Sequence, residues 1–257
     1  MIKPGLCSMS FPDLSPADVI KQCRMNSVRV IEWSGRPYHL PPESPEAKVK
    51  EIAKMCSDAG ISTPSYGSYF YVLNNSPEQF PRVLDVAQGL GAGTVRVWSS
   101  EYGNPGEMSE IDEDQKKRLI ENTRVIAEAA AARGIRVAFE YHLHTPTCGA
   151  EEVLYVLEKA GHENCYTYFQ MIIETRRSVD ENVADLERVY PRLAYVHCHY
   201  YEGEELFPLS RGAHMWKPLY EKLVELGYSG PLYLEYYRDY TPEKMKADLE
   251  FLRGLGR

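Results

Sequence analysis

Short runs of apolar, β-branched and aromatic residues alternate along this chain with longer helix-like segments. A short apolar run is typical of a buried strand, and a longer segment with capping residues at its ends is typical of a helix. Ser15-Pro16 has the start signal of a helix, and Gly134 is a glycine of the kind that commonly ends one. The predicted strands cover residues 2–8, 28–33, 61–65, 94–98, 136–141, 165–170, 193–199 and 231–236. The predicted helices cover residues 16–25, 45–59, 77–90, 112–133, 150–160, 180–190, 214–226 and 242–254.

The eight predicted strands alternate with eight predicted helices, which indicates repeated parallel βα units. Eight such units predict a single (β/α)8 TIM barrel that spans residues 1–257 as one domain. About 250 residues is a typical length for this fold. The longest irregular stretches follow the second, third, fourth and seventh predicted strands. They are βα loops, and such loops build the active-site face of a TIM barrel.

Polar side chains that can bind a metal stand where several predicted strands end. They are Glu32, Glu140, Gln170, His197 and Glu235. A single glutamate at such a place is usually just a solvated carboxylate, and a single core histidine is usually hydrogen-bonded. When several such residues converge on one barrel mouth, their charge needs a counter-charge, because unpaired buried charge is costly. The mixture of oxygen and nitrogen donors suits one divalent cation, Mn²⁺, Mg²⁺, Co²⁺ or Zn²⁺, and the lack of a cysteine pair argues against structural zinc.

Composition and charge narrow the classes of protein. Hydrophobic residues make up 44% of the chain, and the formal net charge is −8, so we expect no nucleic-acid partner. No apolar run approaches the ~20 residues of a membrane span, and the N-terminus lacks the basic segment followed by an apolar segment that is typical of a signal peptide. The six scattered cysteines are typical of free thiols in a reducing cytoplasm, which is the predicted location. The chain has no glycine-rich phosphate loop, so a nucleotide cofactor is not expected. A homo-oligomer is compatible with the sequence.

The chain resembles, over essentially its full length, the xylose-isomerase-like barrels of the sugar phosphate isomerase/epimerase family. The residues that carry this resemblance are Glu140, Gln170 in Tyr168-Phe169-Gln170, His197 in Tyr195-Val196-His197, and Glu235 in Tyr233-Leu234-Glu235. Further stretches are similar to one branch of these barrels, namely Ile31-Glu32-Trp33 with His39, Ser65-Tyr66-Gly67-Ser68-Tyr69, Arg96-Val97-Trp98, Glu140-Tyr141-His142, and Phe207-Pro208-Leu209 with Gly212 and Trp216. The resemblance implies four metal ligands at strand ends, namely Glu140, Gln170, His197 and Glu235. Gln170 stands where the family usually has an aspartate, and its neutral amide lowers the charge of the site and its expected metal affinity.

The expected reaction is isomerisation or epimerisation of a small sugar, sugar phosphate or keto-acid. Both reactions remove a proton next to a carbonyl, and Glu140 and Glu235 would be the acid/base pair that takes and returns it through an enediolate. One alternative is a metal-dependent lyase or dehydratase of the inosose type, and another is a non-catalytic sugar-binding barrel. A nuclease of the AP-endonuclease type would need more histidine and aspartate ligands and a basic face.

Further polar residues of the predicted loops and strand ends are expected to contact the substrate. They are Glu32, His39, Tyr66, Arg96, His142, His199 and Arg211. His199 lies on the same strand face as His197 and could replace it as metal ligand, although His197 is favoured. Arg211 could hold an anionic group, but a surface arginine in a loop is an equally good interpretation.

Overall fold

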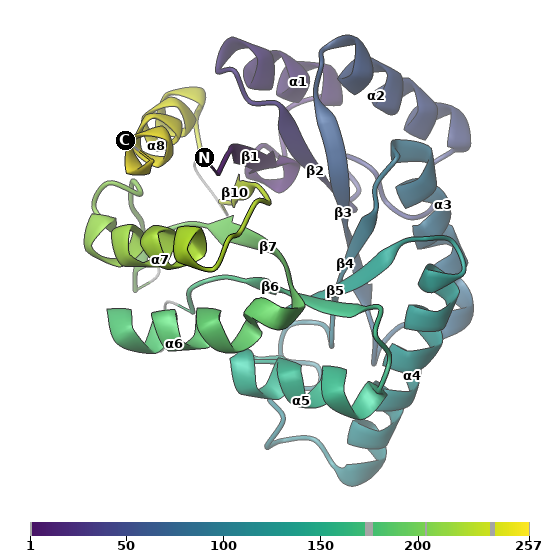
Figure 1. The fold of residues 1–257 in the computed structure, drawn as a ribbon. Helices are drawn as coiled ribbons and strands as arrows, with labels where there is room; N and C mark the ends of the chain where they lie inside the picture. The colour runs from purple at the N-terminus through teal and green to yellow at the C-terminus, as the bar shows by residue number, and fades with distance from the viewer. Residues whose placement is uncertain (1, 173–176, 204, 237–239, 257) are drawn as a thin grey trace.

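The structure is a computed structural model that describes residues 2–172, 177–203, 205–236 and 240–256. Within these residues, eight parallel strands form a closed barrel, and helices surround it (Figure 1). The barrel strands are β1 (Pro4–Cys7), β2 (Val30–Ser34), β3 (Ser62–Tyr71), β4 (Thr94–Trp98), β5 (Arg136–Glu140), β6 (Cys165–Phe169), β7 (Leu193–Cys198) and β10 (Leu232–Leu234). Neighbours in sequence are neighbours in the barrel, and β10 pairs with β1 to close it. The predicted (β/α)8 barrel is therefore confirmed.

The helices of the outer ring begin and end close to the predicted positions. They are α1 (Pro16–Met25), α2 (Glu46–Asp58), α3 (Phe80–Leu90), α4 (Glu113–Ala131), α5 (Ala150–Ala160), α6 (Val179–Val189), α7 (Ala213–Glu225) and α8 (Pro242–Leu255). Ser15 caps α1 by accepting a hydrogen bond from the backbone N–H of Asp18. Asp112 and Gln115 form a capping box at the start of α4. Gly161 adopts the left-handed conformation that ends α5.

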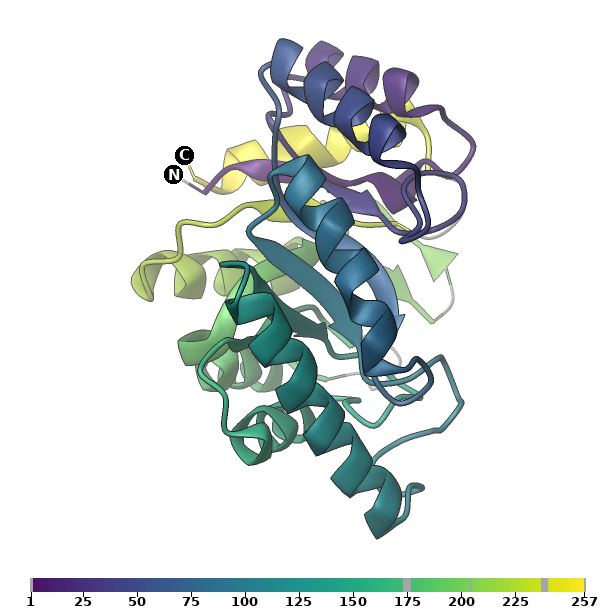
Figure 2. The same ribbon diagram turned by 90° about the vertical axis from the view of Figure 1, so that its right-hand side faces the viewer.

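The third strand differs from its prediction. The sequence predicts that it ends at residue 65, whereas β3 continues to Tyr71. A register shift between Gly67 and Phe70 lets the strand bulge and still pair with β4, up to Tyr71 opposite Trp98. A short antiparallel hairpin, β8 (Tyr201–Glu202) and β9 (Glu205–Leu206), was also not predicted. Figure 2 shows this hairpin beyond the C-terminal ends of the barrel strands, where the predicted catalytic loops lie.

Two packed regions hold the barrel together. Apolar residues from the outward faces of the strands pack against the helices in one large core. Inside the barrel, a smaller cluster of Tyr168, Tyr195 and Tyr233 with Ala138 and Ala194 fills the interior. Because these side chains block the bore, the polar residues of the strand ends sit on a solid base and not in an open channel. Among the described residues, no helix has the length and apolar character needed to cross a membrane.

Candidate active site

Five ionisable side chains meet at the C-terminal end of the barrel, and we refer to them together as the ion cluster. They are Glu32 of β2, Arg96 of β4, Glu140 of β5, His197 of β7, and Glu235, which directly follows β10. All five are buried, and Glu235 is the most accessible at 7% exposure. Parallel strands bring their carboxyl ends to one edge, so residues far apart in sequence converge here.

Three members of the ion cluster have the arrangement of a metal site. One ligand atom from each of Glu140, His197 and Glu235 lies within 4.8 Å of the other two. His197 Nδ1 is 2.7 Å from Glu235 Oε2 and 3.7 Å from Glu140 Oε1. Among the described residues, neither ring nitrogen of His197 has a partner with acceptable hydrogen-bond geometry. One ligand atom from each of these three residues could therefore be offered to a single metal ion.

Arg96 is the permanent cation of the ion cluster. Its Nε donates to Glu32 Oε1 at 2.9 Å, and its Nη1 forms an ion pair with Glu140. Gly67 makes room for the guanidinium, because a Cβ at that position would lie 2.5 Å from Arg96 Nη2. Burial alone would raise the pKa of Glu32, but Arg96, His197 and the Tyr168 hydroxyl outweigh it and lower this pKa to about 2. Glu32 is therefore ionised across the physiological range.

The charges of the ion cluster fit a divalent cation. Three buried carboxylates face one guanidinium, which leaves two negative charges if His197 is neutral. Burial raises the pKa of Glu235, but His197 and Arg96 outweigh burial and bring it well below its usual range. Burial likewise lowers the pKa of His197, and the Glu235 carboxylate outweighs burial so that the net shift is upward. One divalent ion would balance the remaining charge and occupy the histidine lone pair.

A cavity of about 610 Å³ lies against the ion cluster at Glu140 and Glu235, and we call it the main cavity. Glu140 and Glu235 form part of its wall together with an aromatic side built by Tyr69, Tyr71 and Trp98. Trp98 Nε1 donates to Glu140 Oε2 at 2.6 Å, so one aromatic ring holds a carboxylate in place. Aromatic and polar walls around a pair of carboxylates are suited to a small polyhydroxylated ligand.

Three of the other predicted residues also line the main cavity. His142 stacks on Trp98 with ring centroids 4.8 Å apart. Gln170 donates from its side-chain amide nitrogen to the Tyr141 carbonyl at 2.8 Å. His199 Nε2 lies 3.2 Å from the Met171 carbonyl, and burial lowers the pKa of His199. His197, and not His199, is the histidine that lies in the cluster with Glu140 and Glu235.

The remaining predicted substrate contacts lie away from the wall of the main cavity. Glu32 and Arg96 are buried inside the ion cluster. His39 is fully buried with Nδ1 3.0 Å from Ser8 Oγ, and Tyr66 donates from its hydroxyl to the Leu40 carbonyl at 2.6 Å. Arg211 is exposed and forms an ion pair with Glu202 of the hairpin.

Besides Trp98, which donates to Glu140, sequence reasoning missed Tyr168 and Cys7 as residues that touch the ion cluster. Tyr168 donates from its hydroxyl to Glu32 Oε2 at 2.6 Å. Cys7 Sγ lies 3.6 Å from Glu32 Oε1 and 3.9 Å from Glu235 Oε1. Both left a signal in the sequence, because Cys7 ends the first strand and Tyr168 precedes Gln170 by two residues on the same strand face.

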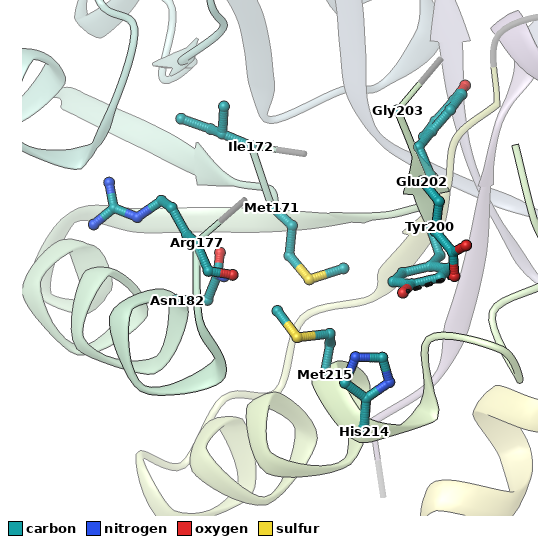
Figure 3. Close-up of a pocket in the computed structure, with 10 residues that line it drawn as sticks. Met171, Ile172, Arg177, Asn182, Tyr200, Glu202, Gly203, His214 and Met215 are labelled. Carbon is teal, nitrogen blue, oxygen red and sulfur yellow. Dashed lines mark hydrogen bonds between the residues drawn. The ribbon is translucent and has the colours of Figure 1, made fainter. Parts of the chain in front are cut away.

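A second cavity of about 350 Å³ adjoins the main cavity and shares Met171, Ile172, Tyr201 and Gly203 with it. Figure 3 shows its methionines, Met171 and Met215, with their side chains directed toward each other. Glu202 is the one carboxylate among the described residues that line it, and it accepts a hydrogen bond from Tyr200 and pairs with Arg211. Among the described residues, Glu140 and Glu235 therefore line the main cavity and not the second one.

Comparisons with known structures agree with this architecture. The probable 3-DHS dehydratase AsbF from Bacillus anthracis superposes with a TM-score of 0.81 at 17% identity, over 98% of this chain and 99% of the other. D-psicose 3-epimerase from Clostridium cellulolyticum H10 gives a TM-score of 0.75 at 15% identity, over 99% of each chain. A xylose isomerase-like TIM barrel protein from Mycobacterium smegmatis, in complex with magnesium, gives 0.75 at 16% identity, over 99% of this chain and 96% of the other. These identities establish a shared fold.

Sequence comparison gives the family. No curated protein matches the sequence. The model of one protein family matches residues 20–255, which is nearly the whole barrel. The chain belongs to the xylose isomerase-like TIM barrel family.

Proposed function

We propose that the protein is a divalent-metal-dependent isomerase or epimerase of a small sugar, sugar phosphate or keto-acid. One observation carries the proposal. Glu140 and Glu235 line the same cavity, and each places a carboxylate oxygen within 4.8 Å of a ligand atom of His197. Two ionisable carboxylates beside one bound substrate suit a reaction in which a proton leaves one carbon and a proton returns to the same or a neighbouring carbon.

Glu140, His197 and Glu235 would hold the cation, and Gln170 is the candidate for a fourth ligand. The amide nitrogen of Gln170 is already bound to the Tyr141 carbonyl, so its amide oxygen is the atom left to coordinate. A bound divalent ion supplies a Lewis acid that polarises the substrate carbonyl and makes the neighbouring C–H more acidic. Mn²⁺, Mg²⁺, Co²⁺ and Zn²⁺ all accept this donor set.

The protein's own side chains divide the remaining work. One of the two carboxylates takes the proton from the carbon next to the carbonyl, and the other returns a proton to give the product. Trp98 fixes Glu140 by its indole N–H, while Cys7 Sγ lies 3.9 Å from Glu235 Oε1. His142 and His199 line the cavity, where they would hold substrate hydroxyls. The aromatic side of the cavity would exclude water from the reacting carbon.

The similar structures support this reaction class and one alternative. D-psicose 3-epimerase and L-ribulose 3-epimerase share the fold, with TM-scores of 0.75 and 0.77. The probable 3-DHS dehydratase, which shares the fold with a TM-score of 0.81, supports a lyase as the alternative. Dehydration begins with the same proton abstraction and then loses a hydroxyl group, so the product separates the two reactions.

The proposal is tested by turnover of ketoses, aldoses and keto-acids with Mn²⁺ in D₂O. Solvent deuterium should appear at the carbon next to the carbonyl, and a substrate deuterated there should show a primary isotope effect. Glu140→Gln or Glu235→Gln should each lower kcat by ~10²- to 10⁴-fold, the range of a positioned acid or base. The double variant should lose far less than the product of the two losses, because both residues act on one reaction.

Glu128→Gln on the exposed face of α4 is the matched control and should keep full activity. Near-normal turnover in both active-site variants, together with no isotope effect, would exclude this mechanism. Tight sugar binding without any turnover or exchange would leave the binding-barrel alternative in its place.

A further inference from the structure

Arg36 is a cation on the wall of the main cavity that the proposed chemistry does not use. It lies in the loop after β2, where its backbone N–H donates to Ser34 Oγ at 3.2 Å. Its guanidinium carbon stands 4.0 Å from the centroid of the Tyr69 ring. The side chain is half-buried, so its charge is only partly solvated.

The charge of Arg36 is not paired with any carboxylate that the structure describes. Among the residues that the structure describes, no ion pair involves Arg36, whereas Arg96 has Glu32 and Glu140, and Arg211 has Glu202. Its neighbours are the phenols of Tyr69 and Tyr71, which burial keeps neutral by raising their pKa values. Arg36 is also the single lysine or arginine among the described residues that line the main cavity. A guanidinium that faces a cavity with its hydrogen-bonding fork free of carboxylate is suited to carboxylate or phosphate.

Tyr69 fixes the position of this cation relative to the ion cluster. Its φ of +54° is unusual for a residue with a bulky side chain, and it occurs at the bulge of β3. In this conformation the ring lies 4.0 Å from the Arg36 guanidinium carbon and 5.1 Å from that of Arg96. The hydroxyl of Tyr69 approaches Met9 Sδ at 2.6 Å. The ring therefore places Arg36 within the span of one small molecule from the carboxylates.

We propose that Arg36 binds an anionic substituent of the substrate, a carboxylate or a phosphate, while the opposite end of the same molecule reacts between Glu140 and Glu235. The inference rests on the proposed function and narrows its substrate class to acidic sugars and sugar phosphates. The chain carries a net charge of −8, and three carboxylates lie at the base of the site. An anion would enter against this field, and Arg36 supplies the attraction that offsets it.

Binding of three unreactive probes tests the proposal without requiring turnover. D-gluconate and D-glucitol 6-phosphate carry the two kinds of anion, D-glucitol is the neutral match, and none has a carbonyl that can react. Wild-type protein with Mn²⁺ should bind at least one anionic probe more tightly than D-glucitol in calorimetric titrations. Arg36→Gln should reduce that preference by about 10- to 100-fold, the range expected for a lost charge-assisted contact. Arg36→Lys should restore part of it.

The comparison of variant with wild type removes other contributions to binding. A carboxylate can also ligate the metal, but that effect is common to both proteins and cancels in the ratio. Arg82→Gln removes one exposed positive charge on α3 and should leave the preference unchanged. The relative affinities of gluconate and the phosphate identify the anion.

The possible outcomes separate this inference from the proposed reaction. Equal anion preference in wild type and Arg36→Gln, or no binding of either anionic probe to the wild type, would overturn the role of Arg36. If a neutral ketose still exchanges deuterium alongside either of these results, the reaction stands without the anion site. An Arg36-dependent anion preference in a protein that never exchanges deuterium would keep the anion site and remove the reaction.

Discussion

Glu32 has no exposed surface, and both of its carboxylate oxygens already accept hydrogen bonds. Oε1 receives the Nε–H of Arg96, and Oε2 receives the Tyr168 hydroxyl. The residue was expected to contact the substrate, but its surroundings favour a different role. It orients the guanidinium that pairs with Glu140 and so fixes a carboxylate that faces the cavity. We therefore treat Glu32 as a positioning residue.

Replacing Glu32 by glutamine should destabilise the protein in a pH-dependent way. The carboxyl has a pKa of about 2 in the folded protein and an ordinary value of 4.5, so folding favours its ionised form. Its contribution is complete above pH 4.5 and disappears as the pH falls toward 2. At pH 7 we expect Glu32→Gln to lose on the order of 3 kcal/mol in the free energy of unfolding. Urea denaturation at pH 7, 5, 4 and 3 measures the difference, and a loss of equal size at pH 3 and pH 7 would contradict this origin.

Gly67 sets the space available to Arg96. An alanine methyl group there would lie 2.5 Å from Arg96 Nη2 and 3.1 Å from Glu32 Oε1. Gly67→Ala should therefore push the guanidinium from its place, lower the free energy of unfolding by roughly 1–3 kcal/mol and reduce kcat. Gly93→Ala is the matched control, because nothing lies within 4 Å of an added Cβ at that exposed position. Similar losses from the two substitutions would show that crowding at Arg96 is not the cause.

At the scale of elements, the sequence predicted the site best where a strand ends in a polar residue. Glu140, His197 and Glu235 could be placed together because parallel strands share one carboxyl edge. The outward direction of Tyr66 was harder to foresee. Ser65 bonds the Tyr233 hydroxyl inside the barrel, so alternation turns Tyr66 outward, but this follows only once the strand's inner face is known. His39 lies in a loop, where no periodicity indicates which way a side chain points.

The extension of β3 could not be predicted from local residue preferences. Gly67 and Ser68 have the composition of a loop, and the pairing of Phe70 with Val97 of β4 is a contact between separate strands. This extension carries Tyr69 and Tyr71 to the cavity, which explains why the sequence did not single out Arg36 beside them.

The start of α4 offers a change of stability that is independent of the site. Asp112 Oδ1 accepts the backbone N–H of Gln115 at 2.7 Å, and Gln115 Oε1 accepts the backbone N–H of Asp112 at 3.0 Å. Asp112→Ala should lower the free energy of unfolding by about 1 kcal/mol, because the first turn loses its cap. Asp112→Ser should retain most of that stability. Activity per folded molecule should stay unchanged, and a fall in kcat would indicate an unexpected link between α4 and the cavity.

For the whole molecule, the charge of the ion cluster should make stability depend on divalent cations. A ligand that binds only the folded state adds about 2.7 kcal/mol at a concentration 100 times its Kd. Thermal unfolding with and without Mn²⁺ should show this increase in the wild type and its reversal by EDTA. His197→Ala should reduce the increase, because the cation loses its nitrogen ligand. An identical Tm shift in this variant would place the cation elsewhere.

The contact between Cys7 and Glu235 has a consequence for folding during synthesis. These two residues are 228 positions apart, yet their side chains lie together where β1 pairs with β10. A ribosome therefore has to release almost the entire barrel before Glu235 can join Glu140 at the site. Earlier nascent chains hold Glu140 and Arg96 without Glu235. The proposed acid/base pair is complete only once β10 has joined the barrel. Chains that end before β10 should therefore have no catalytic activity.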